Sequence, residues 1–344
     1  MKNKKLKILF RTSGGRAESK ELGFGHIFRT MHLAKNLSSN NLFFLIEDYG
    51  GIKKILPKNK NNIFYIKKNI DEKDDIDKTI NFIQEKKIDI VIVDKYKTSK
   101  NYLREIKKFS KLVYISDLNE IDYPADLLID GFIGLKETQR KNKFGTNCLL
   151  GPSYQIINPN FSHKVKIKKK YDLLISFGGF DEKNIIENIL DTIVNESNFS
   201  KIKIILGPGT KMSQKIMKIS KASNNRIILV QSVKNMHKEI SLSKFGICSG
   251  GLTTYEFASQ KVPFAIICQV KHQLLTATEW EKLKIAKNLG IMNQTTQKKI
   301  SKLLKQISEK NTGLKTNSII DGYGSKRVAK AIMNLGKSSS NLIK

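Results

Sequence analysis

Short apolar runs rich in β-branched residues alternate with amphipathic stretches along most of the chain. In the first half this pattern predicts strands at 6–11, 42–47, 62–67, 89–94, 112–117 and 126–131. A second series is predicted at 171–179, 201–209, 226–232, 244–251 and 263–270. Helical patterns separate the strands and end the chain. Regular alternation of this kind indicates an α/β protein built on parallel sheets.

Between the two series, residues 149–170 (LLGPSYQIINPNFSHKVKIKKK) contain two prolines and a basic run without helical period. The interruption predicts two doubly wound, Rossmann-like domains. We expect an amino-terminal domain at 1–155, a linker at 156–170 and a carboxyl-terminal domain at 171–344. The two domains are expected to face a cleft, because ligands of such sheets gather at the carboxyl ends of the strands.

Charge is the one bulk property that suggests a different class of protein. The net charge of +31 over 344 residues is typical of proteins that bind nucleic acid or anionic membranes. Only 7 of the 62 basic residues are arginine, however, and the lysines are spread along the whole chain. Nucleic-acid binders favour arginine for bidentate contacts, so we expect no nucleic-acid partner. The positive field is still expected to attract anionic nucleotides.

Other bulk features exclude several classes. No run approaches the roughly 20 apolar residues of a membrane helix, and the first ten residues do not resemble a signal peptide. The three cysteines are widely spaced, and no metal-ligand spacing is present. We therefore expect a cytoplasmic monomer with no integral membrane segment, no bound metal and no cofactor.

The stretch LGFGHIFRT (22–30) joins a glycine-rich loop to the first predicted helix. Gly25 allows the backbone to approach a ligand, and the helix amino end attracts anions. His26 lies at the start of that helix, where it is expected to stay neutral and to suit general-base catalysis. Arg16 and Arg29 are candidates to hold a phosphate or carboxylate of the substrate. The alternative is a plain turn followed by a helix-start histidine.

The stretch ICSGGLTTYEFA offers a second ligand loop, where a strand gives way to a helix. Backbone N–H groups and hydroxyls there form a candidate diphosphate site at Gly250, Gly251, Leu252 and Thr253. Glu256, one turn into the helix, is a candidate to accept hydrogen bonds from ribose hydroxyls. ISFGGFDEKN repeats the arrangement with Gly178 and Gly179. The alternative is an ordinary strand–turn–helix joint with a surface glutamate.

Two further stretches supply candidates for substrate binding. Asp94 and Tyr96 in VIVDKYK end a predicted strand and are therefore expected near the cleft. His272 and Gln273 in VKHQLLTATEW lie where a strand gives way to a helix, a suitable position for sugar hydroxyls. A structural turn and helix capping are the respective alternatives.

Taken in order, GFGHIFR, GPSYQIINPNF, ISFGGFDEKN, SGGLTTYEFA and HQLLTATEW resemble one family over nearly the whole chain. It is the UDP-sugar hydrolase family of pseudaminic acid biosynthesis, which is grouped with a spore-coat polysaccharide biosynthesis protein and related to MurG-type transferases. The resemblance implies a GT-B fold. It also implies metal-independent, inverting hydrolysis of UDP-2,4-diacetamido-2,4,6-trideoxy-β-L-altrose to UDP and the free sugar.

The resemblance also implies residue roles. It places the catalytic base on His26, the ribose-binding acid on Glu256 and the sugar-site pair on His272 and Gln273. It places the nucleotide loop on Gly250, Gly251, Leu252 and Thr253. The chain departs from the family at Lys95, where histidine is frequent, and at Asn158, where arginine is frequent.

Two alternative functions remain open at this point. In a UDP-sugar-dependent glycosyltransferase of surface polysaccharide or glycan synthesis, His26 would deprotonate an acceptor hydroxyl instead of water. A nucleotide-sugar-binding or nucleic-acid-binding protein would bind without turnover.

Overall fold

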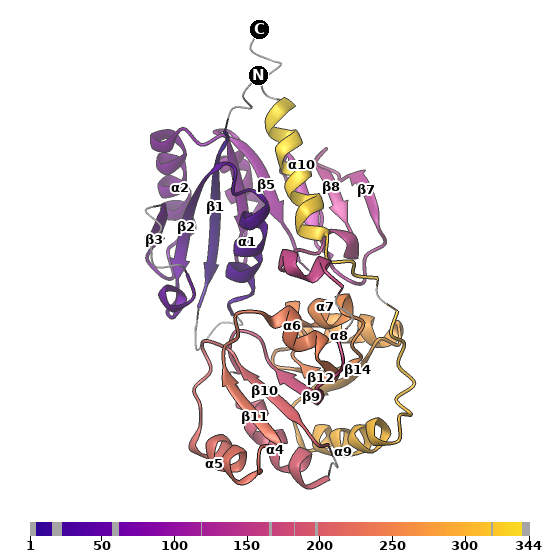
Figure 1. Ribbon diagram of the computed structural model, residues 1–344. Coiled ribbons are helices and arrows are strands. Elements are labelled where there is room, and N and C mark those ends of the chain that lie inside the picture. Colours follow the sequence, from indigo (N-terminus) through magenta and orange to yellow (C-terminus); the bar gives the residue numbers. More distant parts are fainter. Residues whose placement is uncertain are drawn as a thin grey trace. The chain divides into compact units, whose positions relative to one another are not determined.

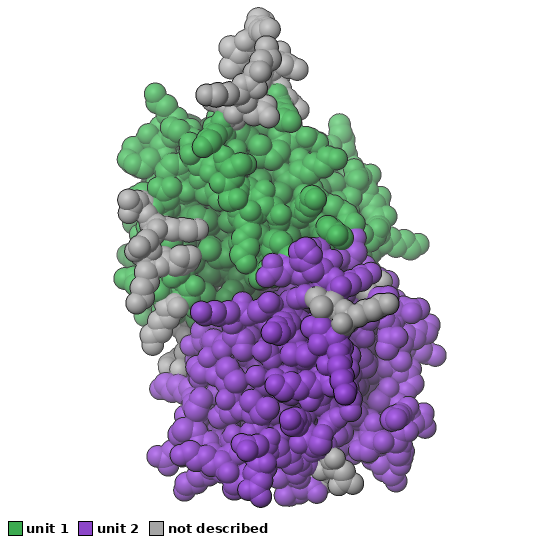
Figure 2. All heavy atoms as spheres, viewed as in Figure 1, with its two compact units in different colours: residues 1–159, 322–344 green, residues 160–321 purple. Residues whose placement is uncertain are grey.

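The computed structural model describes residues 5–15, 23–56, 62–117, 119–164, 167–181, 183–196, 199–317 and 319–338. The chain forms two compact units, unit 1 of residues 1–159 and 322–344 and unit 2 of residues 160–321 (Figure 1, Figure 2). Unit 2 is one uninterrupted segment. Unit 1 is completed by the end of the chain.

Unit 1 is built on a sheet that has eight strands among its described residues. Their order is β3-β2-β1-β4-β5-β6-β8-β7, and neighbours are parallel except for the antiparallel pair β7 and β8. The strands are β1 (Lys7–Gly14), β2 (Asn41–Asp48), β3 (Ile63–Ile66), β4 (Ile90–Asp94), β5 (Lys111–Ile115), β6 (Leu127–Asp130), β7 (Thr138–Lys141) and β8 (Asn147–Leu150). The winding reverses between β1 and β4, which is the point where ligands bind in doubly wound sheets.

The helices of unit 1 pack in two pairs. They are α1 (Gly25–Asn36) with α10 (Gly324–Ser338), and α2 (Glu72–Lys86) with α3 (Lys100–Lys107). Every residue of β4 is buried, as expected for a strand between two helix layers. Val91 and Val93 belong to the core cluster that includes α2 and α3, whereas Ile90 lies against Gly336 of α10. Successive side chains of β4 therefore pack on opposite faces of the sheet, one set in the core with α2 and α3 and the other against α10.

Unit 2 repeats this winding with six parallel strands among its described residues, in the order β11-β10-β9-β12-β13-β14. The strands are β9 (Tyr171–Ser176), β10 (Ile202–Leu206), β11 (Ile227–Gln231), β12 (Ser243–Cys248), β13 (Phe264–Cys268) and β14 (Ala286–Ile291). The helices are α4 (Ile185–Glu196), α5 (Gln214–Ala222), α6 (Met236–Ser241), α7 (Leu252–Ser259), α8 (Gln273–Lys282) and α9 (Gln294–Ser308). Short 3₁₀ segments lie at η1 (Ile52–Lys54) and η2 (Pro152–Tyr154) in unit 1 and at η3 (Pro159–Ser162), where the chain passes from unit 1 to unit 2.

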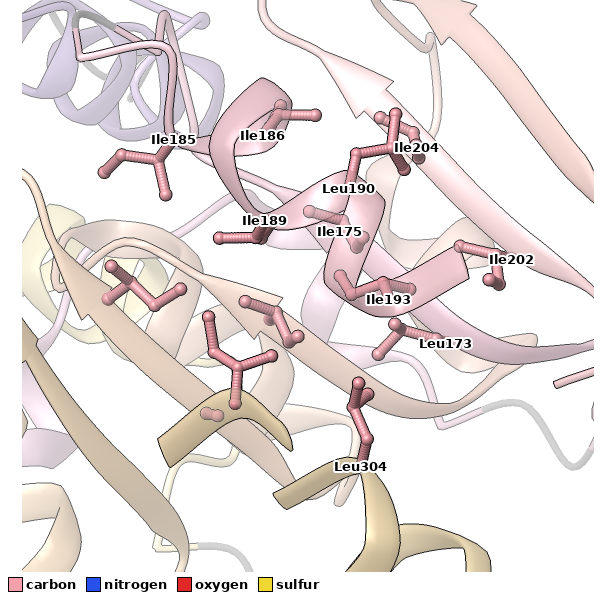
Figure 3. Packing of buried hydrophobic residues seen from close by; sticks show 14 of the residues in the cluster. Leu173, Ile175, Ile185, Ile186, Ile189, Leu190, Ile193, Ile202, Ile204 and Leu304 are labelled. Carbon is pink, nitrogen blue, oxygen red and sulfur yellow. The ribbon is translucent and has the colours of Figure 1, made fainter. Parts of the chain in front are cut away.

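The core of unit 2 forms between the sheet and the apolar faces of α4 and α9 (Figure 3). Helix α4 contributes side chains that recur on one face, and they are Ile185, Ile186, Ile189, Leu190 and Ile193. These pack on strand residues such as Leu173 and Ile204, with Leu304 of α9 beside them. Full burial of one such side chain contributes about 1.5–3 kcal/mol, so this face fixes α4 on the sheet.

The predicted fold class is confirmed, because both sheets are parallel and doubly wound apart from the edge strand β7. Strands β7, β8 and β14 are additional to the predicted ones. β7 reads TQRK and is mostly exposed, and β14 reads AKNLGI, so neither carries the apolar run on which the prediction depends.

The division into units differs from the predicted domain boundaries at the carboxyl end. The first crossing, between residues 159 and 160, lies inside the predicted linker at 156–170. The prediction assigns residues 322–344 to the second domain, whereas α10 packs on α1, β5 and β6 of unit 1. An amphipathic pattern reveals that a helix has an apolar face but not which sheet that face covers. None of the described helices is long and apolar enough to cross a membrane.

Candidate active site

His26 and Asp94 form a hydrogen-bonded pair at the carboxyl edge of the unit 1 sheet. His26 is the second residue of α1, which follows β1, and Asp94 is the last residue of β4. Because β1 and β4 are neighbours, with Thr12 opposite Asp94, the two side chains meet at the reversal of the winding. His26 Nδ1 lies 2.7 Å from Asp94 Oδ1, and 19% of the histidine side chain is exposed.

The surroundings of Asp94 keep it ionised. Burial opposes the charge, but the Arg29 guanidinium and then His26 lower the pKa of Asp94 to about 2. An ionised carboxylate only accepts hydrogen bonds, so His26 Nδ1 carries the proton and donates it to Asp94. This assignment leaves Nε2 with its lone pair, and Nε2 has no hydrogen-bond partner among the described residues. The pair therefore has the form of an oriented general base.

Arg29 is bound by two carboxylates rather than pointing to solvent. Its Nε and Nη2 donate to Asp94 at 2.8 and 2.6 Å, and its Nη1 and Nη2 donate to Asp117 at 2.5 and 3.0 Å. The expectation that Arg29 holds a phosphate or carboxylate of the substrate requires correction, because the guanidinium is buried and already paired. Asp94 is also fully buried, and its carboxylate is hydrogen-bonded to His26 and Arg29. Asp117 was not among the predicted residues, but it follows β5 much as Asp94 ends β4, and a carboxylate just after a buried strand is the sequence signal that marks both.

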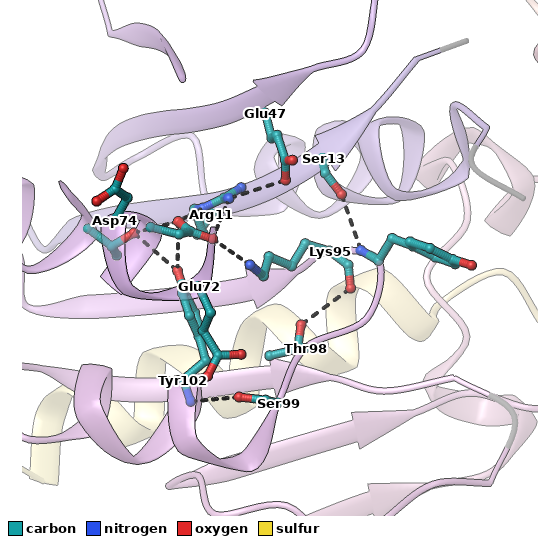
Figure 4. Close-up of polar contacts among 12 residues, drawn as sticks. Arg11, Ser13, Glu47, Glu72, Asp74, Lys95, Thr98, Ser99 and Tyr102 are labelled. Carbon is teal, nitrogen blue, oxygen red and sulfur yellow. Dashed lines mark hydrogen bonds and ion pairs between the residues drawn. The ribbon is translucent and has the colours of Figure 1, made fainter. Parts of the chain in front are cut away.

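A second buried polar network lies beside β1 and β4 (Figure 4). Arg11 donates from Nε and Nη2 to Asp75 at 2.9 and 2.7 Å, and its Nη2 lies 3.5 Å from Glu47. Lys95 places its Nζ 2.5 Å from Asp75 and 4.2 Å from the centre of the Tyr102 ring. Burial and the charge of Arg11 lower the pKa of Lys95. Two cations and two carboxylates balance here, so the network ties β1, β2 and α2 together.

The other predicted residues of unit 1 lie in different surroundings. Tyr96 is half-buried, and its backbone N–H donates to Ser13 Oγ at 3.1 Å, which fixes the loop after β4 to the end of β1. Gly25 is exposed, and a Cβ there would meet no atom within 4 Å. Arg16 lies outside the described residues. Asn158 Oδ1 accepts a hydrogen bond at 3.5 Å from Nζ of Lys35, in the last turn of α1.

In unit 2, the loops that follow β9, β10 and β12 meet at the carboxyl edge of the sheet. Gly178 adopts a φ of +77°, which favours glycine, and the position of a Cβ there is 3.8 Å from Thr253 Oγ1. Gly209 N–H donates to the carbonyl of Gly179 at 2.9 Å, and Ser249 Oγ donates to the carbonyl of Phe177. The predicted glycines of the first loop and the residues of the second therefore lie together.

The amino end of α7 has no side-chain cap. Its cap residue is Gly251, so the N–H groups of the first turn, including those of Leu252 and Thr253, point out of the helix without an acidic partner. Other helices are closed by side chains that accept from the first turn, and these caps are Asp71, Ser99, Ser213, Asn235 and Asn293. α1, α7 and α8 have no such side-chain cap. The start of α4, which follows Gly178 and Gly179, is closed by Asp181, whose carboxylate accepts from the N–H groups of Ile185 and Ile186. An uncapped amino end is suited to an anion.

Gln273 connects α8 to the glycine loop. Its Oε1 accepts from the backbone N–H groups of Gly250 and Gln269, at 3.3 and 2.9 Å. Because the oxygen is engaged, the amide nitrogen is the part left to donate to a ligand. His272, the residue before α8, is exposed. Gln269 was not singled out from the sequence, yet its side chain donates to the Phe177 carbonyl at 3.2 Å and so joins the same loops.

Glu256 is a partly buried carboxyl group with no hydrogen-bond or ion-pair partner among the described residues. Burial raises its pKa to about 7. Such groups are usually paired in folded proteins, so a lone carboxyl one turn into α7 is a candidate to accept hydrogen bonds from a ligand. No group of three or more His, Cys, Asp or Glu that could hold a metal ion occurs in the described part of the chain.

Comparisons with known proteins show what the whole chain is similar to. No protein-family model matches the chain. The UDP-2,4-diacetamido-2,4,6-trideoxy-beta-L-altropyranose hydrolase of Campylobacter jejuni is 29% identical over 278 residues, which cover 79% of this chain and 95% of that protein. The spore coat polysaccharide biosynthesis protein SpsG of Bacillus subtilis is 24% identical over 292 residues, with 79% and 81% covered.

A third relative is longer than this chain. The uncharacterized protein MJ1062 of Methanocaldococcus jannaschii is 28% identical over 283 residues, which are 77% of this chain and 56% of that protein. The chain thus spans about half the length of that relative.

Solved structures define the fold. MurG of Acinetobacter baumannii superposes with a TM-score of 0.62 at 14% identity, covering 95% of this chain and 99% of MurG. MnaA of S. aureus, in a structure with UDP, gives 0.61 at 14% identity, with 98% of each chain covered. The chain has a GT-B fold. The predicted resemblance is confirmed, since the relatives of this GT-B protein include the hydrolase and SpsG.

Proposed function

We propose that this GT-B protein is an enzyme that hydrolyses a UDP-linked 2,4-diacetamido-2,4,6-trideoxyhexose to UDP and the free sugar. A product of this kind serves the biosynthesis of pseudaminic-type acids. The observation that carries the proposal is the His26–Asp94 pair with its available Nε2, in a chain related along 79% of its length to a hydrolase of such a substrate.

Unit 2 is the proposed nucleotide-binding unit. The diphosphate binds the N–H groups of Gly251, Leu252 and Thr253 at the start of α7. Gly250, whose own N–H donates to Gln273, belongs to the same nucleotide loop, and Gly178 and Gly179 allow close approach. Glu256 accepts hydrogen bonds from the ribose hydroxyls, which gives its lone carboxyl a partner. The resemblance assigns the sugar to His272 and Gln273, and the free amide nitrogen of Gln273 suits that role.

Unit 1 is the proposed catalytic unit. His26 Nε2 removes a proton from water as the water oxygen bonds to the anomeric carbon. The bond from that carbon to the diphosphate oxygen breaks, and UDP leaves with the electron pair. Attack from the face opposite the diphosphate inverts the anomeric centre. UDP is a good leaving group, and the positive end of α7 stabilises its charge, so the scheme needs no metal ion.

The remaining candidates of unit 1 are assigned to the sugar. Tyr96 stands on the loop that follows Asp94, and Gly25 leaves open space at the start of α1. Arg16, outside the described residues, is proposed to contact the substrate as well. Arg29 and Asp94 act on His26 and not on the substrate.

The test is release of UDP from a panel of UDP-sugars by the full-length protein, without an acceptor. We expect His26→Asn to keep its affinity for UDP and to lose about 10²–10⁴ in turnover, the usual contribution of one general base. His163→Asn replaces an exposed histidine of unit 2 and is the matched control, expected to retain full activity. Chelators should leave the wild type unaffected, and labelled water should place its oxygen on the anomeric carbon.

Three results would contradict the proposal. Full activity of His26→Asn would remove the base. UDP release that depends on an added acceptor sugar would make the protein a glycosyltransferase, with His26 activating the acceptor hydroxyl. Binding of UDP-sugars without any turnover would make it a binding protein.

A further inference from the structure

The Arg29 guanidinium connects His26 to a carboxylate that His26 does not touch. Arg29 Nη2 lies 3.2 Å from His26 Nδ1, 2.6 Å from Asp94 Oδ1 and 3.0 Å from Asp117 Oδ2. Asp117 gives both of its oxygens to Arg29, and 48% of its side chain is exposed. Asp117 is therefore held in place while remaining in contact with water.

The cluster of Asp94, Arg29, Asp117 and His26 has a different charge balance from an isolated His–Asp pair. In such a pair the carboxylate stabilises the imidazolium that forms as the base accepts a proton. Here Asp94 also accepts two hydrogen bonds from Arg29, so the positive charge of Arg29 already balances the negative charge of Asp94 without any contribution from His26. Asp117 supplies the second negative charge. With it, the cluster carries one excess negative charge when His26 is neutral and becomes neutral when His26 is protonated.

Other ionisable groups face this cluster from neighbouring strands. Burial and the charge of Asp117 raise the pKa of Asp130, at the end of β6, to about 7, while the N–H groups of Phe132 and Asn119 oppose the rise. Burial raises the pKa of Tyr114 on β5, so its phenol stays neutral. Asp117 is thus the carboxylate, besides Asp94, that contacts Arg29 directly.

We propose that Asp117 is a positioning residue that sets the proton affinity of His26 through Arg29, without contact with His26 or with a substrate. It holds the guanidinium against Asp94 and restores the negative charge that Arg29 cancels. The inference rests on the proposed function only where it concerns turnover, because the protonation of His26 can be measured without a substrate.

The experiment is an NMR titration of the histidine ring protons in the full-length protein, with His26→Gln used to assign the His26 signal. Arg29 Nη2 lies 3.2 Å from His26 Nδ1 and 3.0 Å from Asp117 Oδ2, so Asp117 lies within about 6 Å of His26. One unit charge at that distance corresponds to roughly 0.5–2 pH units, depending on screening. Asp117→Asn should therefore lower the His26 midpoint by about one pH unit, and Arg29→Gln should raise it by a similar amount.

Controls separate this effect from a general change in charge. Asp122→Asn removes an equal charge from an exposed pair with Lys143 in the same unit, and should leave the His26 midpoint unchanged. The Asp117→Asn substitution is repeated in an Asp130→Asn background, so that ionisation of Asp130 cannot mask the shift. Asp117→Glu should restore the wild-type midpoint.

The outcomes are distinguishable. A His26 midpoint that does not move in Asp117→Asn, in either background, overturns the inference even if the protein is an active hydrolase. If the midpoint moves as stated and the acid limb of kcat/KM moves with it, both the inference and the base role of His26 are supported. If the midpoint moves but UDP-sugars are not turned over, the inference stands and the proposed function fails.

Discussion

Replacement of Glu256 with glutamine should make unit 2 more stable and its binding of UDP weaker. The carboxyl group is partly buried without a partner, and burial raises its pKa from 4.5 to about 7. The folded protein therefore holds on to a proton that the unfolded chain releases between those two pH values. Stability falls as the pH rises through this window, and the full cost is present above pH 7.

The size of the effect follows from the pKa shift. A shift from 4.5 to about 7 corresponds to an upper bound of about 3 kcal/mol at pH 8. Water reaches part of the side chain, so we expect roughly 1–3 kcal/mol of added stability in Glu256→Gln at pH 8, and almost none at pH 4.5. Loss of charged hydrogen bonds to ribose should weaken UDP binding by about 1–3 kcal/mol at pH 8.

The chain offers a local probe for the stability measurement. Trp280, its single tryptophan, is fully buried in unit 2 and donates to Thr254 Oγ1 on α7, the helix that carries Glu256. Its fluorescence during urea unfolding at pH 4.5 and pH 8 reports on unit 2, and calorimetry gives the affinity for UDP. Glu309→Gln is the matched control, because Glu309 is exposed in the same unit and its ion pair with Lys305 is long, at 4.0 Å.

The two measurements must move in opposite directions. If Glu256→Gln has wild-type stability at pH 8, the carboxyl group is not isolated in the folded protein. If UDP affinity is also unchanged, Glu256 does not contact the nucleotide. A loss of affinity accompanied by a loss of stability would show only that the helix had been disturbed.

Three further predictions concern other parts of the molecule. Gly251→Ala should leave urea unfolding unchanged, since a Cβ there meets only Ser249 Oγ at 4.0 Å, but it should weaken UDP binding at least tenfold by calorimetry. Gly207→Ala should instead destabilise the fold, because its Cβ would collide with the carbonyls of Gly178 and Gly179. Asp75→Asn should cost about 3–5 kcal/mol in urea unfolding followed by circular dichroism, because it leaves Arg11 and its neighbours without their buried carboxylate; wild-type stability would refute this. Binding of DNA or RNA should be weak and should fall steeply with salt, as measured by fluorescence anisotropy, and a nanomolar, sequence-selective complex at physiological salt would contradict the interpretation of the lysine excess.

The sequence predicts the two sheets and one side of the site because both depend on local patterns. VIVD in a buried strand places Asp94 at a carboxyl edge, and a helix that starts beside it brings His26 within reach. The glycine loops of unit 2 are predictable for the same reason. Each is a strand end followed directly by a helix start.

Features that depend on long-range partners are not predictable in this way. Arg29 turns inward because Asp117 lies beside it in space, 88 residues later in the chain. Arg11 is read from the sequence as part of a strand, and only the arrival of Asp75 from α2 makes a buried arginine favourable. Glu256 has a predictable position, but its lack of a partner can be seen only once its neighbours are in place.

The return of α10 to unit 1 has a consequence for the order in which the protein is made. Val328 and Ile332 of α10 are fully buried, and Gly336 lies against Leu6, which precedes β1, and Ile90 of β4. During translation, residues 160–321 leave the ribosome as an unbroken segment with its own core before this helix has been synthesised. Unit 2 is therefore able to fold while the earlier-made part of unit 1 still waits for its last helix. The half that carries His26 is finished last, and a fragment of residues 1–159 would expose to water the apolar surface that α10 covers.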